Sequence, residues 1–297
     1  MLKKLIQKIK DRLRFIIQDL SRILPDKMYL KILYKKCTKN KLDLSNPQTF
    51  NEKLQWLKLN NRKDEYTKMV DKYEVKKYVA NIIGEQYIIP TIGVYDKFKD
   101  IDFDKLPNQF VLKCTHDSGG IVICKNKNNF DKTKARKILN FSLRRNYFYY
   151  SREYPYKNVK RRIIAEKYMQ DEACKDLRDY KLFCFDGECK LIQVDFDRFK
   201  NHRRNLYDLN WNLIEDLSIK YPSDKNVIIE KPSNLDEMLE IARKLSKNIP
   251  FVRVDLYLIN GKIYFGELTF FHGGGYEKFT PEEWNKKLGD MIKINKK

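Results

Sequence analysis

The stretch from residue 253 to residue 276, RVDLYLINGKIYFGELTFFHGGGY, combines a hairpin pattern with charges that an ordinary core hairpin lacks. Two apolar runs flank Asn260-Gly261, a pair typical of tight hairpin turns. Arg253, Asp255 and Glu267 lie within those runs, and three consecutive glycines follow them. Buried strands seldom keep charges without partners. We therefore expect a hairpin that carries a charged functional site.

The loop length decides whether the two carboxylates can act together. A two-residue loop of Asn260-Gly261 places Gly266 opposite Asp255, so that Asp255 and Glu267 point to opposite faces of the sheet.

A three-residue loop that starts at Ile259, with a glycine bulge, shifts the register by one residue. Arg253 then lies opposite Glu267, and Asp255 lies diagonal to Glu267 on the same face. The apolar side chains of both strands share the other face, so we predict this loop. The predicted polar face, directed toward Lys113 and Lys181, carries Arg253, Asp255, Glu267 and Thr269.

The composition indicates a globular protein with anionic partners. The chain has 297 residues, of which 42% are hydrophobic, and its net charge is +21. Such a charge suits a nucleotide, a nucleic acid, a phosphorylated saccharide or an acidic membrane surface. The six cysteines show no zinc or CxxC spacing, which favours a reducing compartment. We expect a cytoplasmic protein, peripheral at the inner face of the membrane in one interpretation.

Residues 1–24 form a basic amphipathic pattern with apolar residues at helical spacing. Such a helix can lie on an anionic membrane or pack against its own protein, and the pattern leaves both open. No apolar run has the roughly 18–20 residues that span a bilayer.

Turn and cap signals predict an α+β architecture of several subdomains. Thr49 with Glu52 three residues later is a capping box that starts a helix. Asp186-Gly187 predicts a second hairpin over residues 179–198. The predicted organisation is a basic helical extension at 1–48, an N-terminal α/β subdomain at 49–105, a lid with a glycine flap at 106–165 and a C-terminal subdomain at 166–297.

Residues 110–123, FVLKCTHDSGGIVI, place Lys113 at a strand end before a polar glycine loop. Backbone N–H groups of such a loop can wrap a polyphosphate. An ordinary hairpin with a glycine turn explains this stretch equally well when it is taken alone. The loop residues proposed to contact phosphate are Ser118, Gly119 and Gly120.

Two further stretches carry charges on strands. In AEKYMQD, Glu166 and Tyr168 can form a hinge beside an adenine ring, although a partly buried strand end fits the stretch as well. In RDYKLFCF, Asp179 and Lys181 share a strand face because side chains alternate. Arg198 ends the partner strand of that hairpin.

Two motifs suggest other chemistry. FHGGGY at 271–276 resembles the oxyanion loop of some esterases, but the chain has no GxSxG nucleophile elbow. VDFD at 194–197 resembles the DxD of metal-dependent glycosyltransferases through Asp195 and Asp197. That tripeptide is common, and it provides the competing enzyme interpretation.

The ordered set of motifs from about Phe50 to Tyr276 resembles the ATP-grasp superfamily, in particular its TupA-like branch, which is associated with teichuronopeptide and other surface polysaccharide biosynthesis. The resemblance implies an ATP-grasp fold in which two α+β subdomains clasp ATP. It assigns Arg253 and Lys181 to catalysis, and Asp255, Glu267 and Thr269 to magnesium. Many ATP-grasp enzymes read Glu-x-Asn where this chain reads Glu267-Leu268-Thr269. The implied ATP contacts are Lys72, Lys113, Ser118, Gly119, Gly120, Glu166, Tyr168, Asp179 and Arg198, and the implied substrate contacts are Gly273, Gly274 and Gly275.

The resemblance implies an ATP- and Mg2+-dependent carboxylate–amine ligase that forms an amide through an acyl phosphate. Its expected partners are an anionic small-molecule or glycan carboxylate, such as a uronic acid, and an amine. We expect no nucleic acid partner, and a peripheral membrane contact through residues 1–24 is the one further partner considered. The alternatives are a glycosyltransferase of a surface polysaccharide cluster and a basic nucleic-acid or membrane adaptor.

Overall fold

The computed structural model describes residues 21–172, 178–196 and 201–294. Its helices are α2 (Asp26–Thr38), α3 (Phe50–Asn60), α4 (Glu65–Val70), α5 (Glu74–Ile83), α6 (Lys132–Leu143), α7 (Phe148–Ser151), α8 (Leu235–Ser246) and α9 (Glu283–Met291). Its strands are β1 (Thr91–Tyr95), β2 (Phe110–Cys114), β3 (Ile121–Cys124), β4 (Ile163–Lys167), β5 (Asp179–Phe185), β6 (Glu188–Phe196), β7 (Arg203–Tyr207), β8 (Ser218–Ile219), β9 (Val252–Ile259), β10 (Lys262–Thr269) and β11 (Phe279–Thr280). The mixture of helices with antiparallel sheets confirms the α+β prediction.

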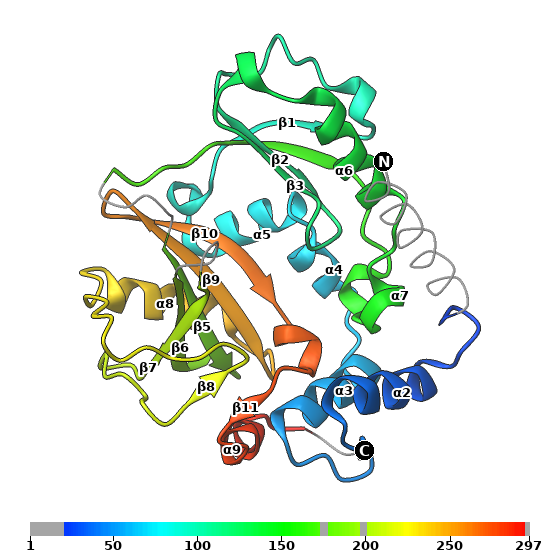
Figure 1. Cartoon of the computed structure of the whole chain (residues 1–297), viewed down its shortest axis with the longest axis vertical. Coiled ribbons are helices and arrows are strands. Elements are labelled where there is room, and N and C mark those ends of the chain that lie inside the picture. The colour runs from blue at the N-terminus through cyan, green and yellow to red at the C-terminus, as the bar shows by residue number, and fades with distance from the viewer. Residues whose placement is uncertain (1–20, 173–177, 197–200, 295–297) are drawn as a thin grey trace.

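The lid is a four-stranded antiparallel sheet in the order β1-β4-β2-β3, with α6 packed on β2 and β3 (Figure 1). Phe103, Phe110 and Phe130 form its core with Leu112 and Leu139, so the lid has a hydrophobic cluster of its own. β1, which we placed in the segment 49–105, pairs with β4 of the lid, and β4 runs past residue 165. The lid sheet therefore takes a strand from the preceding segment.

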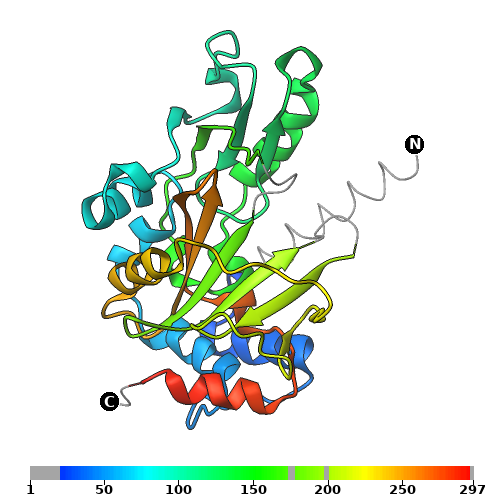
Figure 2. The same cartoon turned by 90° about the vertical axis from the view of Figure 1, so that its left-hand side faces the viewer.

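The larger sheet has five antiparallel strands in the order β10-β9-β5-β6-β7. Helix α8 packs on β5, β6 and β9 and covers one face (Figure 2). Phe50 and Leu54 of α3 belong to the same hydrophobic cluster as these strands. The helices that precede the lid in sequence therefore pack with the C-terminal sheet, and the lid stands above this joint body.

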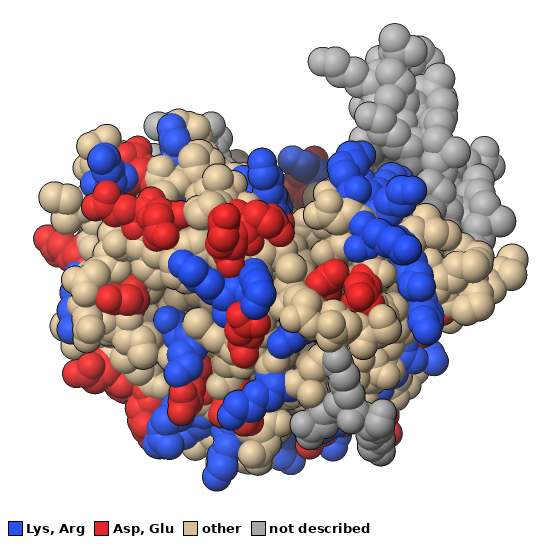
Figure 3. Space-filling view, turned by 90° about the horizontal axis from the view of Figure 1, so that it is seen from below, with Lys and Arg blue, Asp and Glu red and all other residues tan. Residues whose placement is uncertain are grey.

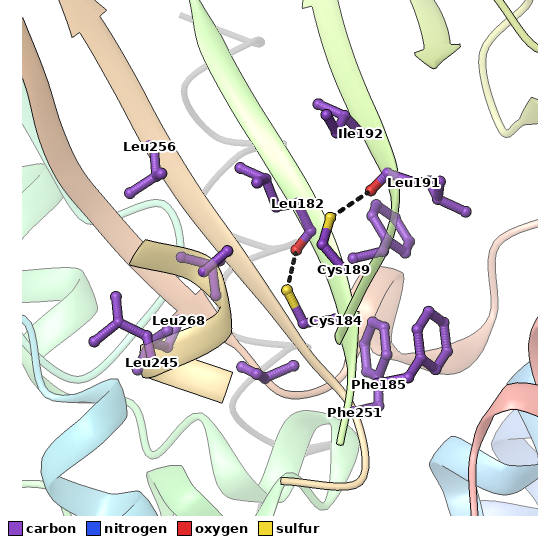
Figure 4. Packing of buried hydrophobic residues seen from close by; sticks show 14 of the residues in the cluster. Leu182, Cys184, Phe185, Cys189, Leu191, Ile192, Leu245, Phe251, Leu256 and Leu268 are labelled. Carbon is purple, nitrogen blue, oxygen red and sulfur yellow. Dashed lines mark hydrogen bonds between the residues drawn. The ribbon is translucent and has the colours of Figure 1, made fainter. Parts of the chain in front are cut away.

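Two of the cysteines, Cys184 and Cys189, lie in the core of the larger sheet. Cys184 and Cys189 are cross-strand neighbours beside Asp186-Gly187, which forms the predicted turn of the β5–β6 hairpin. Each thiol donates to a backbone carbonyl at 3.6 Å, Cys184 to Leu182 and Cys189 to Leu191 (Figure 4). Both are buried free thiols.

The capping box predicted for α3 is confirmed. Thr49 Oγ1 accepts from the Glu52 N–H at 3.3 Å, and the Glu52 carboxylate accepts from the Thr49 N–H at 3.1 Å. A local signal of four residues was sufficient here because both hydrogen bonds close within one turn.

The predicted three-residue loop of the β9–β10 hairpin is wrong. Ile259 pairs with Lys262 across a two-residue turn in which Asn260 and Gly261 both have positive φ. The register shifts instead at Gly266, where a bulge brings Glu267 directly opposite Asp255.

Gly266 explains why the bulge lies there. A Cβ at this position would lie 2.9 Å from the Asp255 carbonyl oxygen. Only a residue without a side chain permits that approach. The shared polar face that we predicted is present, but it is produced by the bulge at Gly266 and not by the loop.

The expected helix of residues 1–24 falls almost wholly outside the described residues, which begin at Ser21. None of the helices in the described part of the chain has the length and hydropathy of a membrane-spanning segment.

Candidate active site

A small cavity of about 210 Å³ lies where the lid, α5 and the β9–β10 hairpin meet. It brings together residues that are far apart in sequence, among them six of the predicted ATP contacts, Lys72, Lys113, Ser118, Gly119, Glu166 and Asp179. Its polar lining consists of Lys72, Lys76, Lys113, Ser118, Glu166, Asp179, Asp255 and Glu267, and Gly119 and Gly266 approach it through their backbones.

Glu166 is the charged centre of the lid side. Its two carboxylate oxygens lie 2.5 Å from Lys76 Nζ and 2.7 Å from Lys113 Nζ. Burial alone would raise the pKa of Glu166, but the two ammonium groups outweigh burial and lower it. Glu166 is therefore ionised at neutral pH and holds two lysines at the cavity wall.

The glycine flap between β2 and β3 is fixed at its base by polar contacts. Lys72 Nζ donates to the Asp117 carbonyl oxygen at 2.5 Å, and the Asp117 carboxylate accepts from Arg145 at 3.0 Å and from Ser142. Gly120 lies at this base, since a Cβ there would overlap the Ser142 side chain. Ser118 and Gly119 line the cavity, and Gly120 does not.

Arg253 links the polar side chains of the hairpin. Its guanidinium donates two hydrogen bonds of 2.6 Å to Asp255, and it also donates to Glu267 at 3.3 Å and to Thr269 at 3.1 Å. Burial raises the pKa of Asp255 to about 7, against the opposing effect of Arg253. Glu267 is half exposed toward the cavity, so the two carboxylates have different environments.

His272 orients Arg253 from behind. Arg253 Nη1 lies 2.7 Å from His272 Nδ1, and because arginine can only donate, Nδ1 is the acceptor. Burial lowers the pKa of His272 to about 4, so the ring is neutral at pH 7 and carries its proton on Nε2. Nε2 lies 2.9 Å from Glu277, which also pairs with Arg204 at 3.0 Å.

Lys181 and Asp179 lie on the polar face of β5, as their spacing predicted. Lys181 pairs with Asp179 on its own strand and lies 3.2 Å from Asp195 on β6. Asp179 lines the small cavity, and Lys181 does not. We predicted that the polar face of the hairpin is directed toward Lys181. Lys181 is the cross-strand partner of Asp255 in the β5–β9 pair, so the two residues are neighbours in the sheet.

Asp195, the residue of the competing glycosyltransferase interpretation, is fully engaged. One carboxylate oxygen lies 3.1 Å from His202 and accepts from Arg204 at 2.8 Å, and the other accepts from Gln193 at 2.9 Å and lies 3.2 Å from Lys181. A carboxylate offers about four lone-pair sites, which these contacts occupy. Asp197, its predicted companion, lies outside the described residues, as does Arg198.

Tyr168 lines a second, larger cavity of about 880 Å³ between β3, the segment after β4 and the end of β6. Met169 lies beside Tyr168 in the wall of this cavity. Ile121 and Tyr257 line both cavities, so the two adjoin. Glu166 and Tyr168 thus face neighbouring parts of one cleft.

The glycine loop has an anchor that the sequence did not indicate. Gly273, Gly274 and Gly275 all have positive φ, a conformation that other residues rarely adopt. The Gly274 carbonyl oxygen accepts from Lys58 Nζ at 2.7 Å and from Gln55 at 3.0 Å. The Gly274 N–H donates to the Phe271 carbonyl oxygen at 2.8 Å, so this N–H is used inside the loop and not offered to a substrate.

The hairpin carboxylates suit a magnesium ion. Among the described residues, no group of three or more His, Cys, Asp or Glu side chains is arranged to hold a metal ion. Mg2+ does not need one, because it is commonly held by one or two carboxylates together with substrate phosphates and water. Asp255 and Glu267 are directly opposed hard oxygen donors at the cavity, so they fit this requirement. Thr269 as a third ligand stays a prediction.

Lys76 and Lys58 are the main site residues that sequence reasoning missed. Lys76 lies in the first turn of α5, four residues after the predicted phosphate contact Lys72, and this short spacing could have found it. His272 appeared in the sequence only as part of an esterase-like motif. No local pattern distinguishes Lys58 from Lys53, the other lysine of α3.

The chain matches the family described as TupA-like ATPgrasp over residues 52–293. No curated protein matches it. Among solved structures, the D-alanine–D-alanine ligase from Bacillus anthracis complexed with ATP is similar over 75% of this chain and 63% of the ligase, with 18% identity and a TM-score of 0.42. The ATP-grasp ligase PsnB complexed with a minimal precursor is similar over 77% of this chain and 62% of PsnB, with 8% identity and a TM-score of 0.42. The chain spans less than two thirds of the length of either protein.

Proposed function

The chain belongs to the TupA-like ATP-grasp family, and from this premise we propose that it is an ATP- and magnesium-dependent ligase that joins a carboxylate to an amine. In the proposed reaction a carboxylate oxygen attacks the γ-phosphorus of ATP and ADP leaves. The amine then attacks the carbonyl carbon of the acyl phosphate, inorganic phosphate leaves, and an amide forms.

One observation carries this proposal, the small cavity with cations on one side and opposed carboxylates on the other. Lys72, Lys76 and Lys113 line the side formed by α5 and the lid, and Asp255 and Glu267 line the hairpin side. A polyphosphate with a divalent cation needs both kinds of group in one place. A cavity with only cations would suit any anion.

Each set of residues has a separate role in the proposed reaction. Lys72 and Lys113 would bind phosphate oxygens, and the flap at Ser118 and Gly119 would exclude water above them. Asp255 and Glu267 would hold Mg2+, which when bound neutralises charge on the β and γ phosphates. Arg253, which is held beside Asp255 and Glu267 and contacts His272, would neutralise charge that develops on the transferred phosphoryl group.

We propose a uronic acid or a similar carboxylate of a surface glycan, or its precursor, as the acceptor. The family association with surface polysaccharides supports this class, and the net charge of +21 suits an anionic acceptor. Gly273 and Gly275 remain candidate contacts for its carboxylate.

The first test compares nucleotides and measures product. ATP binding that tightens with Mg2+ supports the ligase, whereas tighter binding of a UDP-sugar with Mn2+ would support the glycosyltransferase. ADP release on a panel of uronates crossed with amines then identifies the substrates. Failure of ATP to bind would contradict the proposal at its first step.

Lys113→Ala tests the assignment of the cavity. We expect ATP affinity to fall by about 10-fold to 100-fold, the value of a charge-assisted hydrogen bond, and turnover to be lost. The fold should survive, because Glu166 keeps Lys76 as a partner. The matched control is Lys137→Ala on the exposed face of α6. Equal ATP affinity in the two variants would remove Lys113 from the site.

A further inference from the structure

The outer face of α2 is basic and free of acidic side chains. Between Ser21 and Leu42 the chain has seven Lys or Arg residues and one acidic residue, Asp26. Asp26 is engaged inward, with Arg62 and Arg152 each at 2.7 Å. We call the exposed side of this segment the α2 surface. Its exposed cations are Arg22, Lys27, Lys31, Lys35, Lys36, Lys39 and Lys41.

The lysines of the α2 surface are solvated. Within the part of the chain that the structure describes, Lys27, Lys31, Lys35 and Lys36 form no ion pair. Figure 3 shows a band of Lys and Arg side chains along the side of the molecule where α2 lies. Their charge is therefore available to an external anion.

Apolar side chains lie among these lysines. Ile23, Met28 and Ile32 have exposed fractions of 81%, 46% and 56%, which is unusual for large hydrophobic residues. At about 100° per residue, Met28 and Ile32 fall between the stripe of Lys31 and Lys35 and the position of Lys36. Basic residues thus flank an exposed apolar strip on both sides.

The opposite side of α2 is fixed to the body of the protein. Leu30 and Tyr34 are buried in a small cluster with Leu42, and Tyr34 packs against Tyr276 with ring centroids 6.2 Å apart. Arg152, itself almost fully buried, also pairs with Asp26 and lies over the Tyr29 ring. The helix is therefore held rigidly, with its basic and apolar side outward.

We propose that the α2 surface binds an anionic lipid bilayer. Lysines that surround exposed apolar side chains are the pattern of helices that lie in the membrane interface, where the cations contact headgroups and the apolar residues enter the acyl boundary. A nucleic acid would use the lysines but would gain nothing from exposing Ile23, Met28 and Ile32 to a phosphate backbone. The proposal concerns α2, independently of residues 1–20, and it does not rest on the proposed ligase reaction.

A bilayer bound at the α2 surface would lie close to the glycine loop of the candidate active site. Tyr276 directly follows the glycine loop, and it contacts Tyr34 on the inner side of α2. The loop therefore lies roughly one helix diameter, about 10 Å, from the outer side of α2. A protein bound through the α2 surface would hold this loop close to the headgroups, within reach of an acceptor that is anchored to lipid.

Vesicle cosedimentation of the full chain tests the proposal. With phosphatidylcholine vesicles that contain about 30% phosphatidylglycerol, the protein should bind, and it should not bind pure phosphatidylcholine. Each basic residue near an anionic surface strengthens partition about fivefold, so Lys27→Gln, Lys31→Gln and Lys35→Gln together should weaken it by about 100-fold. The matched control neutralises three exposed lysines elsewhere, Lys99, Lys137 and Lys247.

A second pair of variants tests the apolar strip. Met28→Ser with Ile32→Ser should weaken binding to the anionic vesicles by about 10-fold or more, because two partly exposed side chains lose their insertion. Val227→Ser with Ile228→Ser, also exposed, is the control and should bind normally. Circular dichroism checks that all variants are folded.

Three results would overturn the proposal. The α2 and control lysine variants could lose binding equally, which would assign binding to net charge alone. Neutralising Lys3, Lys4, Lys8 and Lys10 could abolish vesicle binding while the α2 variants bind normally. The α2 variants could instead lose binding to duplex DNA, or lose a dimer seen by sedimentation velocity, with vesicle binding unchanged.

Discussion

Glu166 and Asp255 are buried carboxylates on opposite sides of one cavity, and their environments differ in the number of cations that face them. Glu166 on β4 pairs with both Lys76 and Lys113, and its pKa is lowered. Within the part of the chain that the structure describes, Asp255 on β9 has one cation at contact distance, Arg253, and burial raises its pKa to about 7. Two cations offset the cost of burial at Glu166, whereas one does not at Asp255, where the neighbouring Asp179 carboxylate raises the pKa further.

The difference separates the two roles. A carboxylate that is already fully neutralised gains little from another cation, so Glu166 fits the role of a residue that positions lysines. Asp255 is incompletely compensated, and it faces the half-exposed Glu267. The hairpin side of the cavity therefore gains most from an added divalent cation, which agrees with the proposed magnesium site.

The largest expected effect comes from removing charge on the hairpin side. Asp255→Asn or Glu267→Gln should reduce magnesium-dependent ADP formation by about 1,000-fold or more, because each removes an oxygen charge that holds the cation. The measurement is a coupled assay of ADP release across a series of Mg2+ concentrations. Glu188→Gln, at an exposed carboxylate of β6, is the control. Activity near that of the control would remove these residues from metal binding.

Glu166→Gln should act mainly on stability. It leaves Lys76 and Lys113 beside a neutral amide in a largely buried place, and losing one partner of a buried ion pair costs about 2–3 kcal/mol of unfolding free energy here, below the fully buried value because both lysines are partly exposed. Urea denaturation measures this. Glu74→Gln removes an exposed partner of Arg162 and should cost less than about 1 kcal/mol. Equal losses would show that the Glu166 cluster is not a buried ion pair.

The pH dependence of stability should have opposite signs at the two carboxylates. The pKa of Glu166 is lowered on folding, so its contribution is present above its ordinary pKa of 4.5 and is lost as the pH falls below that value. The pKa of Asp255 is raised, so its contribution is full below its ordinary pKa of 3.8 and is lost as the pH rises toward 7. Urea denaturation between about pH 3.5 and about pH 7.5 tests this. At each pH the unfolding free energy of Glu166→Gln or of Asp255→Asn is subtracted from that of the wild type. Difference curves of the same sign would contradict the comparison.

Sequence patterns correctly predicted features that depend only on contacts between residues adjacent in sequence. The capping box at Thr49 and the turn at Asp186-Gly187 each depend on a few adjacent residues, and both are present. The hairpin register was missed because the bulge depends on the approach of Gly266 to the Asp255 carbonyl oxygen across the sheet. The turn at Asn260-Gly261 is normal, and the irregularity lies five residues further on.

The site shows the same limit. The order of the motifs along the chain predicted that Lys113, Ser118 and Glu166 share one site, and all three line the small cavity. Lys76 and Lys113 together lower the pKa of Glu166. Lys76 lies on α5, before the lid in sequence, and it contacts Glu166 only after folding. Residue type and spacing name the groups of the site, and packing decides which of them pair.

Lys58 offers a chemical reporter for the glycine loop. Burial lowers the pKa of Lys58 to about 8, so at neutral pH more of it carries a free amine than a surface lysine does. Its side chain is fully buried beneath Gly274, so an acylating reagent cannot reach this amine while the loop stays closed. Pulsed acylation followed by peptide mass analysis would therefore count openings of the loop, because Lys58 is accessible to the reagent only when the loop releases it.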